Sequence, residues 1–399
     1  MRAAPGLFTK RCCFLVCCLS ILLTSWRSVG QHLITGRVVN GEDQTPLPGT
    51  TVFLAGTQKG TTTDAEGRFT LDNLPSATYK LVFTHIGFKT LSTTIAIPVA
   101  KPYRIVLKPD ANQLAVITIR AKRRDNRWKE HVDLFTKNFV GQSENAKLCR
   151  LLNPEVLYFD YKSDGFVAHT TDVLQIENLG LGYRIKFQLD TFAVNNTTHN
   201  IYFKGYSVFD TLTASSPQQA DQWATRRLKA YRGSLMHFMR ALFQNKLTQE
   251  GFVVQFMEEN FNRQGDRWLK SLATDTTATL PPLTGNQPIV YPTLHYRRLV
   301  DTTRFRSSLL NWHLKHLLEV RYTQESESFD YYTIRDRSYF GYKKKPQTSL
   351  IRFRDVDVSV QADGQFFEPD GFRTEGYWSW ELIAEELPVD YQPKNQNQD

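Results

Sequence analysis

The sequence predicts a mainly β protein, in which an N-terminal β-sandwich precedes a larger, antiparallel, β-rich α+β domain with one long amphipathic helix. Three observations predict this fold class. Short alternating runs between Gly, Pro and Asp turns fill residues 33–107, strand-like runs rich in aromatic residues follow from 156, and one helical stripe begins after Pro217. With 399 residues and 41% hydrophobic side chains, the chain can bury the cores of two or three domains.

Residues 1–30 have the pattern of an export signal. A basic start is followed by the apolar run Cys12 to Leu23, and the small residues 28–30 then precede Gln31. The run is too short to cross a hydrocarbon core of ~30 Å as a helix rising 1.5 Å per residue. We therefore expect a Sec signal cleaved near Gly30. An uncleaved signal anchor and a lipoprotein acylated at Cys17 or Cys18 are the alternatives, the second disfavoured because neither cysteine follows a small residue.

Charge and cysteine usage narrow the class of protein. The formal charge of +9 includes four cations of the signal, which leaves +5 on the mature chain. This charge is too mild to argue for a nucleic-acid partner.

Cys149 is the single cysteine after the signal, so no internal disulfide is expected. For Cys149 itself, the role of a buried small hydrophobe is favoured over that of a nucleophile. No later apolar run is long enough for a transmembrane helix, while peripheral membrane association stays open.

Residues 31–108 are predicted to form the sandwich. Apolar residues alternate along several runs, for example Tyr79, Leu81 and Phe83, and so line one face of each strand. The run 64–67, Asp-Ala-Glu-Gly, can close a hairpin, because Asp accepts backbone hydrogens and Gly takes a positive φ. Calcium at Asp64 and Glu66 is disfavoured, because two carboxylates do not make a cage of about six to eight oxygens.

This segment resembles the carboxypeptidase regulatory-like domain, which implies a prealbumin-like sandwich. The resemblance is carried by these chained motifs: Gly36-Arg37-Val38, Pro46-Leu47-Pro48-Gly49-Thr50-Thr51-Val52, Gly60-Thr61-Thr62-Thr63-Asp64-Ala65-Glu66-Gly67-Arg68-Phe69, Tyr79-Lys80-Leu81 and Ile86-Gly87-Phe88. The family is common in exported proteins of the Bacteroidota, where it also precedes the plug of many TonB-dependent receptors. It covers about a fifth of the chain.

A catalytic zinc site of the carboxypeptidase kind is not expected. The chain contains one His-x-x-Glu pair, His316 and Glu319, but no histidine follows as a third ligand. The residues from 309 to 322 also alternate like a strand, on which positions three apart point to opposite faces. We predict no metal and no cofactor.

Residues 109–150 are predicted to be a connector. A basic stretch at 120–124 precedes an amphipathic helix whose apolar residues Trp128, Val132, Phe135 and Phe139 share one stripe. We expect this stripe to dock on the second domain.

Residues 151–390 are predicted to form the second domain, with a disordered tail at 391–399. Ser216 can cap its long helix, with Pro217 in the first turn and an apolar stripe that continues to Phe243. Strands are expected on both sides of this helix, including 331–334 and 295–299. The region is similar to one that accompanies the same module in other Bacteroidota proteins, through 176–183, 231–238 and 387–391, and this resemblance implies no activity.

Two groups of residues are candidate ligand contacts. His237 lies one turn from Arg240 on the predicted helix, and the aromatic side chains of Tyr377, Trp378 and Trp380 could stack on sugar rings. The favoured alternatives are core packing for the aromatic residues, a structural role for His237 and, for the arginines of the helix including Arg240, a solvated helix face.

The sequence contains no Walker loop, nucleophile elbow, paired cysteines or His-Glu-x-x-His motif. We therefore expect an exported, non-enzymatic binding or scaffold protein of the periplasm or outer membrane, whose partner is an envelope protein or a glycan. The alternative is an envelope hydrolase or glycan-processing enzyme with an unrecognised site in the second domain. A cleft with convergent acidic residues or histidines would favour that alternative.

Overall fold

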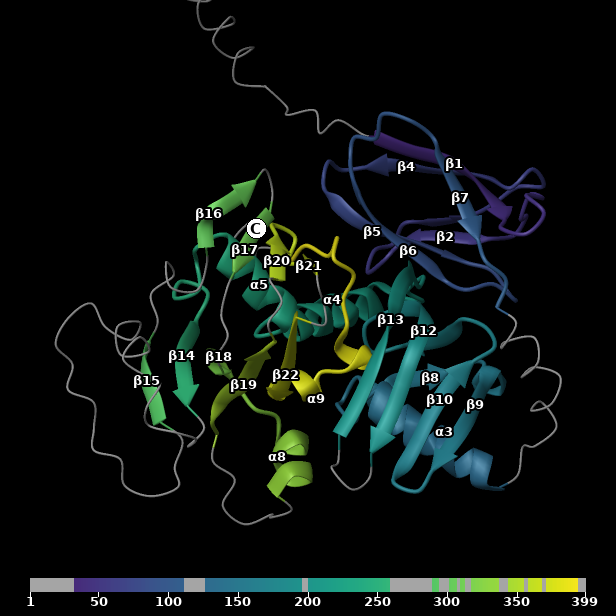
Figure 1. Ribbon diagram of the computed structural model, residues 1–399. Coiled ribbons are helices and arrows are strands. Elements are labelled where there is room, and N and C mark those ends of the chain that lie inside the picture. The colour runs from purple at the N-terminus through teal and green to yellow at the C-terminus, as the bar shows by residue number, and fades with distance from the viewer. Residues whose placement is uncertain are drawn as a thin grey trace, which may run out of the picture.

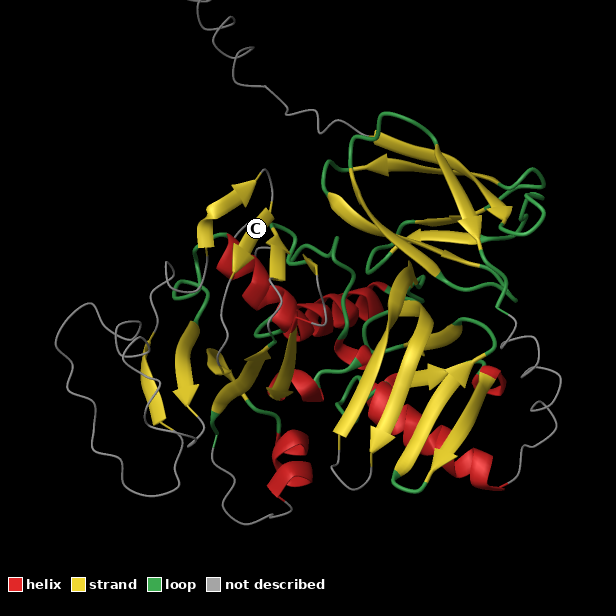
Figure 2. Cartoon of the chain, viewed as in Figure 1, coloured by secondary structure: helices red, strands yellow, loops and turns green. Residues whose placement is uncertain are grey.

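The computed structural model describes residues 32–110, 126–195, 200–258, 289–293, 301–306, 309–312, 317–336, 344–354, 358–367 and 371–393. These form three β-rich units arranged around two consecutive helices and the C-terminal segment (Figure 1). Strands dominate each unit, so the prediction of a mainly β chain is confirmed (Figure 2). The predicted signal, the basic stretch 120–124, the expected strand 295–299 and residues 394–399 of the predicted tail lie outside the described residues. The prediction of a disordered tail from 391 is wrong at its first residue, because Tyr391 packs against Tyr231 with 5.8 Å between ring centroids and its carbonyl accepts from Arg240 at 3.0 Å.

The N-terminal unit is a sandwich of two sheets, with strand orders β4-β1-β7 and β3-β2-β5-β6. Its strands are β1 (His32–Asn40), β2 (Thr51–Leu54), β3 (Gly60–Thr62), β4 (Arg68–Leu74), β5 (Thr78–Thr84), β6 (Leu91–Ala96) and β7 (Tyr103–Leu107). Alternation produces the core as predicted, because every second residue of a strand faces inward. Tyr79, Leu81 and Phe83 are all buried in this core.

The turn at residues 64–67 forms as predicted but does not close a hairpin. One oxygen of Asp64 accepts from the backbone N–H groups of Glu66, at 3.0 Å, and Arg68, at 2.7 Å, and Gly67 has a φ of 73°. However, β3 pairs with β2 whereas β4 pairs with β1. The turn therefore carries the chain from one sheet to the other.

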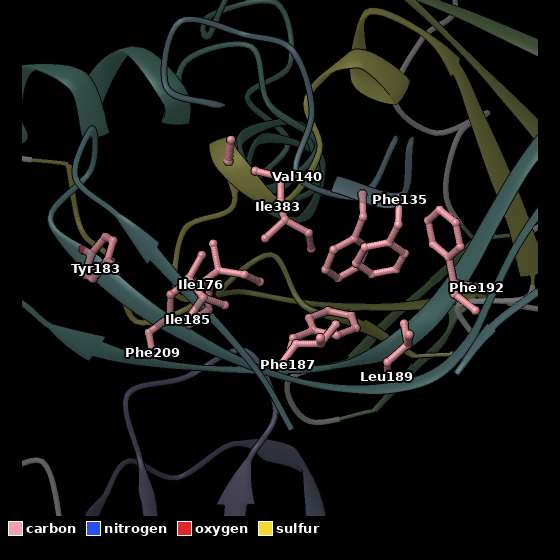
Figure 3. Close-up of a cluster of buried hydrophobic side chains, with 14 of the residues drawn as sticks. Phe135, Val140, Ile176, Tyr183, Ile185, Phe187, Leu189, Phe192, Phe209 and Ile383 are labelled. Atoms are coloured by element: carbon pink, nitrogen blue, oxygen red, sulfur yellow. The ribbon is translucent and has the colours of Figure 1, made fainter. Parts of the chain in front are cut away.

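The middle unit is an antiparallel sheet covered by helix α3 (Asn126–Phe139). The strand order is β8-β11-β12-β10-β9, and β13 pairs along the other side of β12. The strands are β8 (Cys149–Leu151), β9 (Leu157–Lys162), β10 (Gly165–Thr170), β11 (Leu174–Asn178), β12 (Tyr183–Asn195) and β13 (Asn200–Thr211). Phe135 and Phe139 of the helix have no exposed surface. The ring of Phe135 contacts that of Phe192 (Figure 3), and the ring of Phe139 contacts that of Phe187. The predicted docking of the helical stripe is thus confirmed.

The predicted single long helix is two helices, α4 (Pro217–Tyr231) and α5 (Leu235–Phe243). Ser216 caps the first helix, as expected, by accepting from the N–H of Gln219 at 3.2 Å. The break follows from Gly233, which has a φ of 76°, and from Ser234, which caps the second helix. A Cβ at Gly233 would overlap Gln347 Oε1 and approach Tyr322. The apolar stripe continues across the break, which is why the spacing alone predicted one helix.

The third unit combines two small sheets, with strand orders β15-β14-β18-β19-β22 and β16-β17-β20-β21. Its strands are β14 (Phe252–Glu258), β15 (Ile289–Thr293), β16 (Asp301–Arg306), β17 (Leu309–Trp312), β18 (Leu317–Ser326), β19 (Pro346–Phe353), β20 (Val358–Gln361), β21 (Phe366–Phe367) and β22 (Phe372–Gly376). Helix α5 packs into its core, together with Trp378 of the short helix α9 (Tyr377–Trp380).

The strand predicted at 331–334 is wrong, because these residues belong to helix α8 (Phe329–Asp336). The run Tyr-Tyr-Thr-Ile consists of residues with high β-propensity, which suggested a strand. Ser328 precedes the helix, and its hydroxyl accepts from the N–H of Tyr331 at 3.2 Å, a bond typical of a helix start.

The sandwich is fixed to the other units. The outer residues Phe53 and Val82 form a small buried cluster with Val208 of β13. The turn after β2 adds backbone bonds to the edge of β13, from Gly56 N to the Ser207 carbonyl at 2.7 Å and from Phe209 N to the Thr57 carbonyl at 2.9 Å. The sandwich and the middle sheet therefore meet at a hydrogen-bonded junction.

The C-terminal segment, residues 381–391, runs through this junction. Val389 N donates to the Gly56 carbonyl at 2.7 Å, and Ala384 N donates to the Val140 carbonyl at 3.0 Å. Asn178 of the middle sheet donates to the carbonyl of Ala384 at 2.9 Å, and Arg240 of α5 donates to the carbonyl of Val389 at 2.9 Å. One short segment thus contacts all three units and the end of α3.

Candidate functional site

A hollow of about 400 Å³, here called the α8 hollow, lies between the loop after α3 and helix α8. Its lining residues are Gly141, Gln142, Ala146 and Lys147 on the loop and Asp330 and Thr333 on the helix. An ion pair crosses it, with Lys147 Nζ 2.7 Å from Asp330 Oδ2. Asp330 raises the pKa of the Lys147 ammonium, mainly through their hydrogen bond and to a smaller extent through its negative charge. The described walls thus combine apolar surface with polar groups, and their two charged groups pair with each other.

Glu385 holds the loop in place. Ser143 donates a short hydrogen bond to one carboxylate oxygen of Glu385, and the side-chain amide of Asn145 donates to the other at 2.8 Å. Ser143 and Asn145 therefore face the C-terminal segment, while their neighbours Gln142 and Lys147 face the hollow.

Two of the predicted site residues pack against the helix that forms the opposite wall. Tyr331, which follows Asp330, makes edge contacts with Tyr377 at 5.1 Å and with Trp380 at 5.8 Å between ring centroids. Tyr377 is buried and Trp380 is half-buried. The structure brings these two aromatic residues together around α8, where they support the wall of the α8 hollow.

The other predicted site residues lie in the core near the break between the helices. Trp378 is 6% exposed and donates its indole N–H to the carbonyl of Gly233 at 2.7 Å. His237 is 4% exposed, accepts from Gly233 N at 3.1 Å through Nδ1, and lies 3.2 Å from Glu250 through Nε2. Burial lowers the pKa of His237, although Glu250 opposes this effect. The neutral imidazole is therefore favoured, with Nε2–H donating to Glu250.

Arg240 is the fifth predicted residue, and it uses its donors on backbone carbonyls. Its guanidinium donates to the carbonyls of Asp363 at 2.8 Å, Val389 at 2.9 Å and Tyr391 at 3.0 Å. The side chain is 5% exposed. Together with Trp378 and His237, it holds the chain's own backbone rather than presenting polar atoms at a surface.

Sequence reasoning missed the acidic residues of the C-terminal segment. Burial raises the pKa of Glu381 well above its usual range, and Glu385 and Glu325 act in the same direction. Burial raises the pKa of Glu386 to about 7, against a hydrogen bond of 2.6 Å from Ser207. The run Glu381 to Glu386 suggested no site, because acidic residues near a polar tail usually lie in solvent.

Each carboxylate oxygen of Glu385 accepts a hydrogen bond from the loop, one from Ser143 and the other from Asn145. Among the described residues, no group of three or more His, Cys, Asp or Glu side chains could hold a metal ion. Of the His-x-x-Glu pair, Glu319 lies on strand β18, while His316 is outside the described ranges.

The fold and site define a protein with a regulatory-like β-sandwich fixed to a larger β-rich body. Residues 34–119 match the CarboxypepD_reg-like domain, so the chain carries a member of this family, as the motifs indicated. Two TonB-dependent receptors of Formosa agariphila share the segment. Receptor P3 is 28% identical over an alignment that covers 25% of this chain and 10% of the receptor. Receptor P39 is 33% identical over an alignment that covers 22% of this chain and 8% of the receptor.

The shared segment is therefore a small part of each receptor. Among solved structures, a DUF3823 family protein from Bacteroides ovatus covers 46% of this chain and 83% of its own, at 9% identity and a TM-score of 0.17. This score is too low to establish a shared overall fold. In the part of the chain that the structure describes, no helix combines the length and apolar character needed to cross a membrane.

Proposed function

We propose that this chain is an exported, envelope-associated binding or scaffold protein without catalytic activity, whose partner is an envelope protein or a glycan. The α8 hollow is the observation that carries this proposal. It offers amide, hydroxyl and paired charged groups at a rigid surface, because the C-terminal segment holds its loop and two aromatic residues support its helix. Such a surface suits recognition of a polar partner.

The envelope location is supported by two features of the chain. Residues 1–30 have the pattern of a cleaved export signal. The sandwich is similar to a segment of two proteins named as TonB-dependent receptors. The sandwich serves here as a fixed part of a larger body, because its outer face is buried against β13.

A pull-down tests this function. The mature chain, residues 31–399, is incubated with a detergent-solubilised Bacteroidota envelope, beside variants Gln142→Trp, which fills the α8 hollow, and Gln218→Trp, which places the same ring at an exposed position of α4. We expect the mature chain and Gln218→Trp to recover the same specific component and Gln142→Trp to lose it. Equal recovery by Gln142→Trp, or no specific recovery at all, would contradict the proposal.

Envelope hydrolysis is the second candidate function, and Glu381 is the observation that favours it. A carboxyl group whose pKa is raised well above its usual range by burial is suited to act as a general acid. Glycan hydrolysis by the mature chain that disappears in Glu381→Gln, with the melting temperature unchanged, would support this candidate. Absence of hydrolysis with the mature chain would remove it.

A further inference from the structure

The outer sheet of the sandwich carries three arginines side by side, here called the arginine row. Arg37 lies on the central strand β1, and the strand register pairs it with Arg68 of β4 on one side and with Arg104 of β7 on the other. Neighbouring strands lie about 5 Å apart, so the three side chains start from adjacent positions of one sheet. All three residues are exposed.

Alternation along the strands places the arginine row on one face. Each arginine directly precedes a residue of the sandwich core, namely Val38, Phe69 or Ile105. Because successive residues of a strand point to opposite faces, the arginines point away from that core. The other sheet of the sandwich packs on β13, so the row lies on the side that is turned away from the middle sheet (Figure 1).

The stability of the sheet gives no reason for this arrangement, because like charges on directly opposite strand residues are destabilising. In the described part of the chain, none of the three guanidinium groups forms an ion pair. Arg37 donates instead to the backbone carbonyl of Glu66 at 2.9 Å, and Arg104 donates to Gln44 Oε1 at 2.7 Å. These bonds hold two of the groups in place and leave their charges available to an anionic partner.

The surroundings of the row restrict the shape of that partner. Acidic residues lie beyond the row in both directions along the strands. Asp72 is four residues further along β4 than Arg68, and Glu42 and Asp43 follow the opposite end of the row, in the turn after β1. A broad anionic surface, such as a membrane, would bring its charges towards these carboxylates. A narrow anionic chain that lies across the strands, along the row, would avoid them.

A polysaccharide that carries carboxylates along its length has this form. Arginine binds a carboxylate through two parallel N–H bonds, and a repeating charge allows several arginines to act on one molecule. Thr35 and Thr70 form the neighbouring outward-facing cross-strand pair, so their hydroxyl groups lie beside the row. Hydroxyl groups both donate and accept, which suits the hydroxyl groups of sugars.

We propose that the arginine row binds an acidic polysaccharide, with Arg37, Arg68 and Arg104 bonded to carboxylates along its chain. This inference rests on the proposed binding role and names a ligand class for it. It uses a different site from the α8 hollow, so either site can fail without the other.

Binding of the mature chain to polygalacturonate, measured by calorimetry, tests the inference, with uncharged galactan as the neutral probe. Arg37→Gln removes the central charge, and Arg150→Gln, at an exposed position of strand β8, is the matched control. We expect polygalacturonate to bind and galactan not to bind. Arg37→Gln should bind about tenfold more weakly than Arg150→Gln, as the loss of one bond to a charged partner implies. Its melting temperature should not fall, because the substitution removes two like-charge neighbours.

Further probes separate the polysaccharide from other anionic partners. We expect added salt to weaken binding of polygalacturonate, and vesicles of phosphatidylglycerol and poly-glutamate to bind more weakly than this polymer. The inference is overturned if polygalacturonate does not bind, if galactan, the vesicles or poly-glutamate bind at least as tightly, or if Arg37→Gln binds as well as Arg150→Gln. Lost binding with a lower melting temperature of Arg37→Gln would also overturn it, since Arg37 would then act on the fold.

The Gln142→Trp variant separates the two sites. It should bind polygalacturonate normally, because the α8 hollow lies on other elements. Binding of polygalacturonate that depends on Arg37, together with a failed pull-down, would remove the role of the hollow and support the arginine row.

Discussion

Replacing Arg240 tests how the C-terminal segment is held. Arg240→Met keeps the aliphatic stem and removes the three hydrogen bonds to the carbonyls of Asp363, Val389 and Tyr391. A bond from a charged donor contributes about 1.5–3 kcal/mol. The three do not add fully, because the residues that carry these carbonyls are only half-buried and water can replace part of the loss. We expect a loss of about 3 kcal/mol in the free energy of unfolding.

A thermal melt with limited proteolysis measures this loss. At about 2–4 °C per kcal/mol for a unit of this size, Arg240→Met should melt about 6–12 °C lower, and cleavage should begin near Tyr391. Arg240→Lys keeps the charge but has fewer donors, so its melting temperature should lie between those of Arg240→Met and the unaltered protein. Lys246→Ala, at an exposed position after α5, is the control. A melting temperature equal to that of the unaltered protein, with unchanged cleavage, would refute the assigned role of Arg240.

Three further predictions concern a carboxyl group, a glycine and the thiol. Burial raises the pKa of Glu386 to about 7, above its unfolded value near 4.5, so the native state binds the extra proton and stability falls as pH rises from about 4.5 to 7. Glu386→Gln should remove this fall, worth at most about 3 kcal/mol, in chemical unfolding at acidic and mildly alkaline pH; an unchanged pH slope would disprove it. Gly233→Ala should lower the free energy of unfolding by about 2–4 kcal/mol, through its positive φ and its overlap with Gln347, and a denaturant midpoint equal to that of the unaltered protein would show that the break tolerates a Cβ. Burial raises the pKa of the Cys149 thiol to about 12, so alkylation by iodoacetamide at mildly alkaline pH should be far slower than for free cysteine; labelling at the free rate would contradict the burial.

Short-range sequence patterns correctly predicted the core of the sandwich and the start of helix α4. Alternation placed the core of the sandwich, and Ser216 with Pro217 marked the start of α4. The break at Gly233 was missed, because the apolar stripe keeps its helical spacing through it and the positive φ depends on Gln347 and Tyr322, far away in the sequence. Helix α8 was missed because the run of β-prone residues at 331–334 is a stronger local signal than one preceding serine.

The candidate sites were harder to predict than the fold. The walls of the α8 hollow come from segments that no sequence pattern links, and the pair Lys147 and Asp330 exists only once the units are docked. The same holds for the arginine row of the sandwich, which the strand register assembles from three separate strands. For the aromatic residues, by contrast, the sequence already favoured a packing role, whereas the burial of Arg240 depends on packing between units that no local pattern shows.

The docking of the Gly56 turn has a consequence for assembly. An uncovered strand edge is a template on which another chain can add a strand, and the bonds to Ser207 and Phe209 occupy part of the β13 edge. Gly56 has a φ of 73°, and a Cβ there would lie 3.3 Å from the Val389 side chain. A sandwich from another protein would have to reproduce this turn to shield the same edge. Exchange of the module between relatives is therefore restricted by the sheet beneath it, and a mismatched chimera should be prone to self-association.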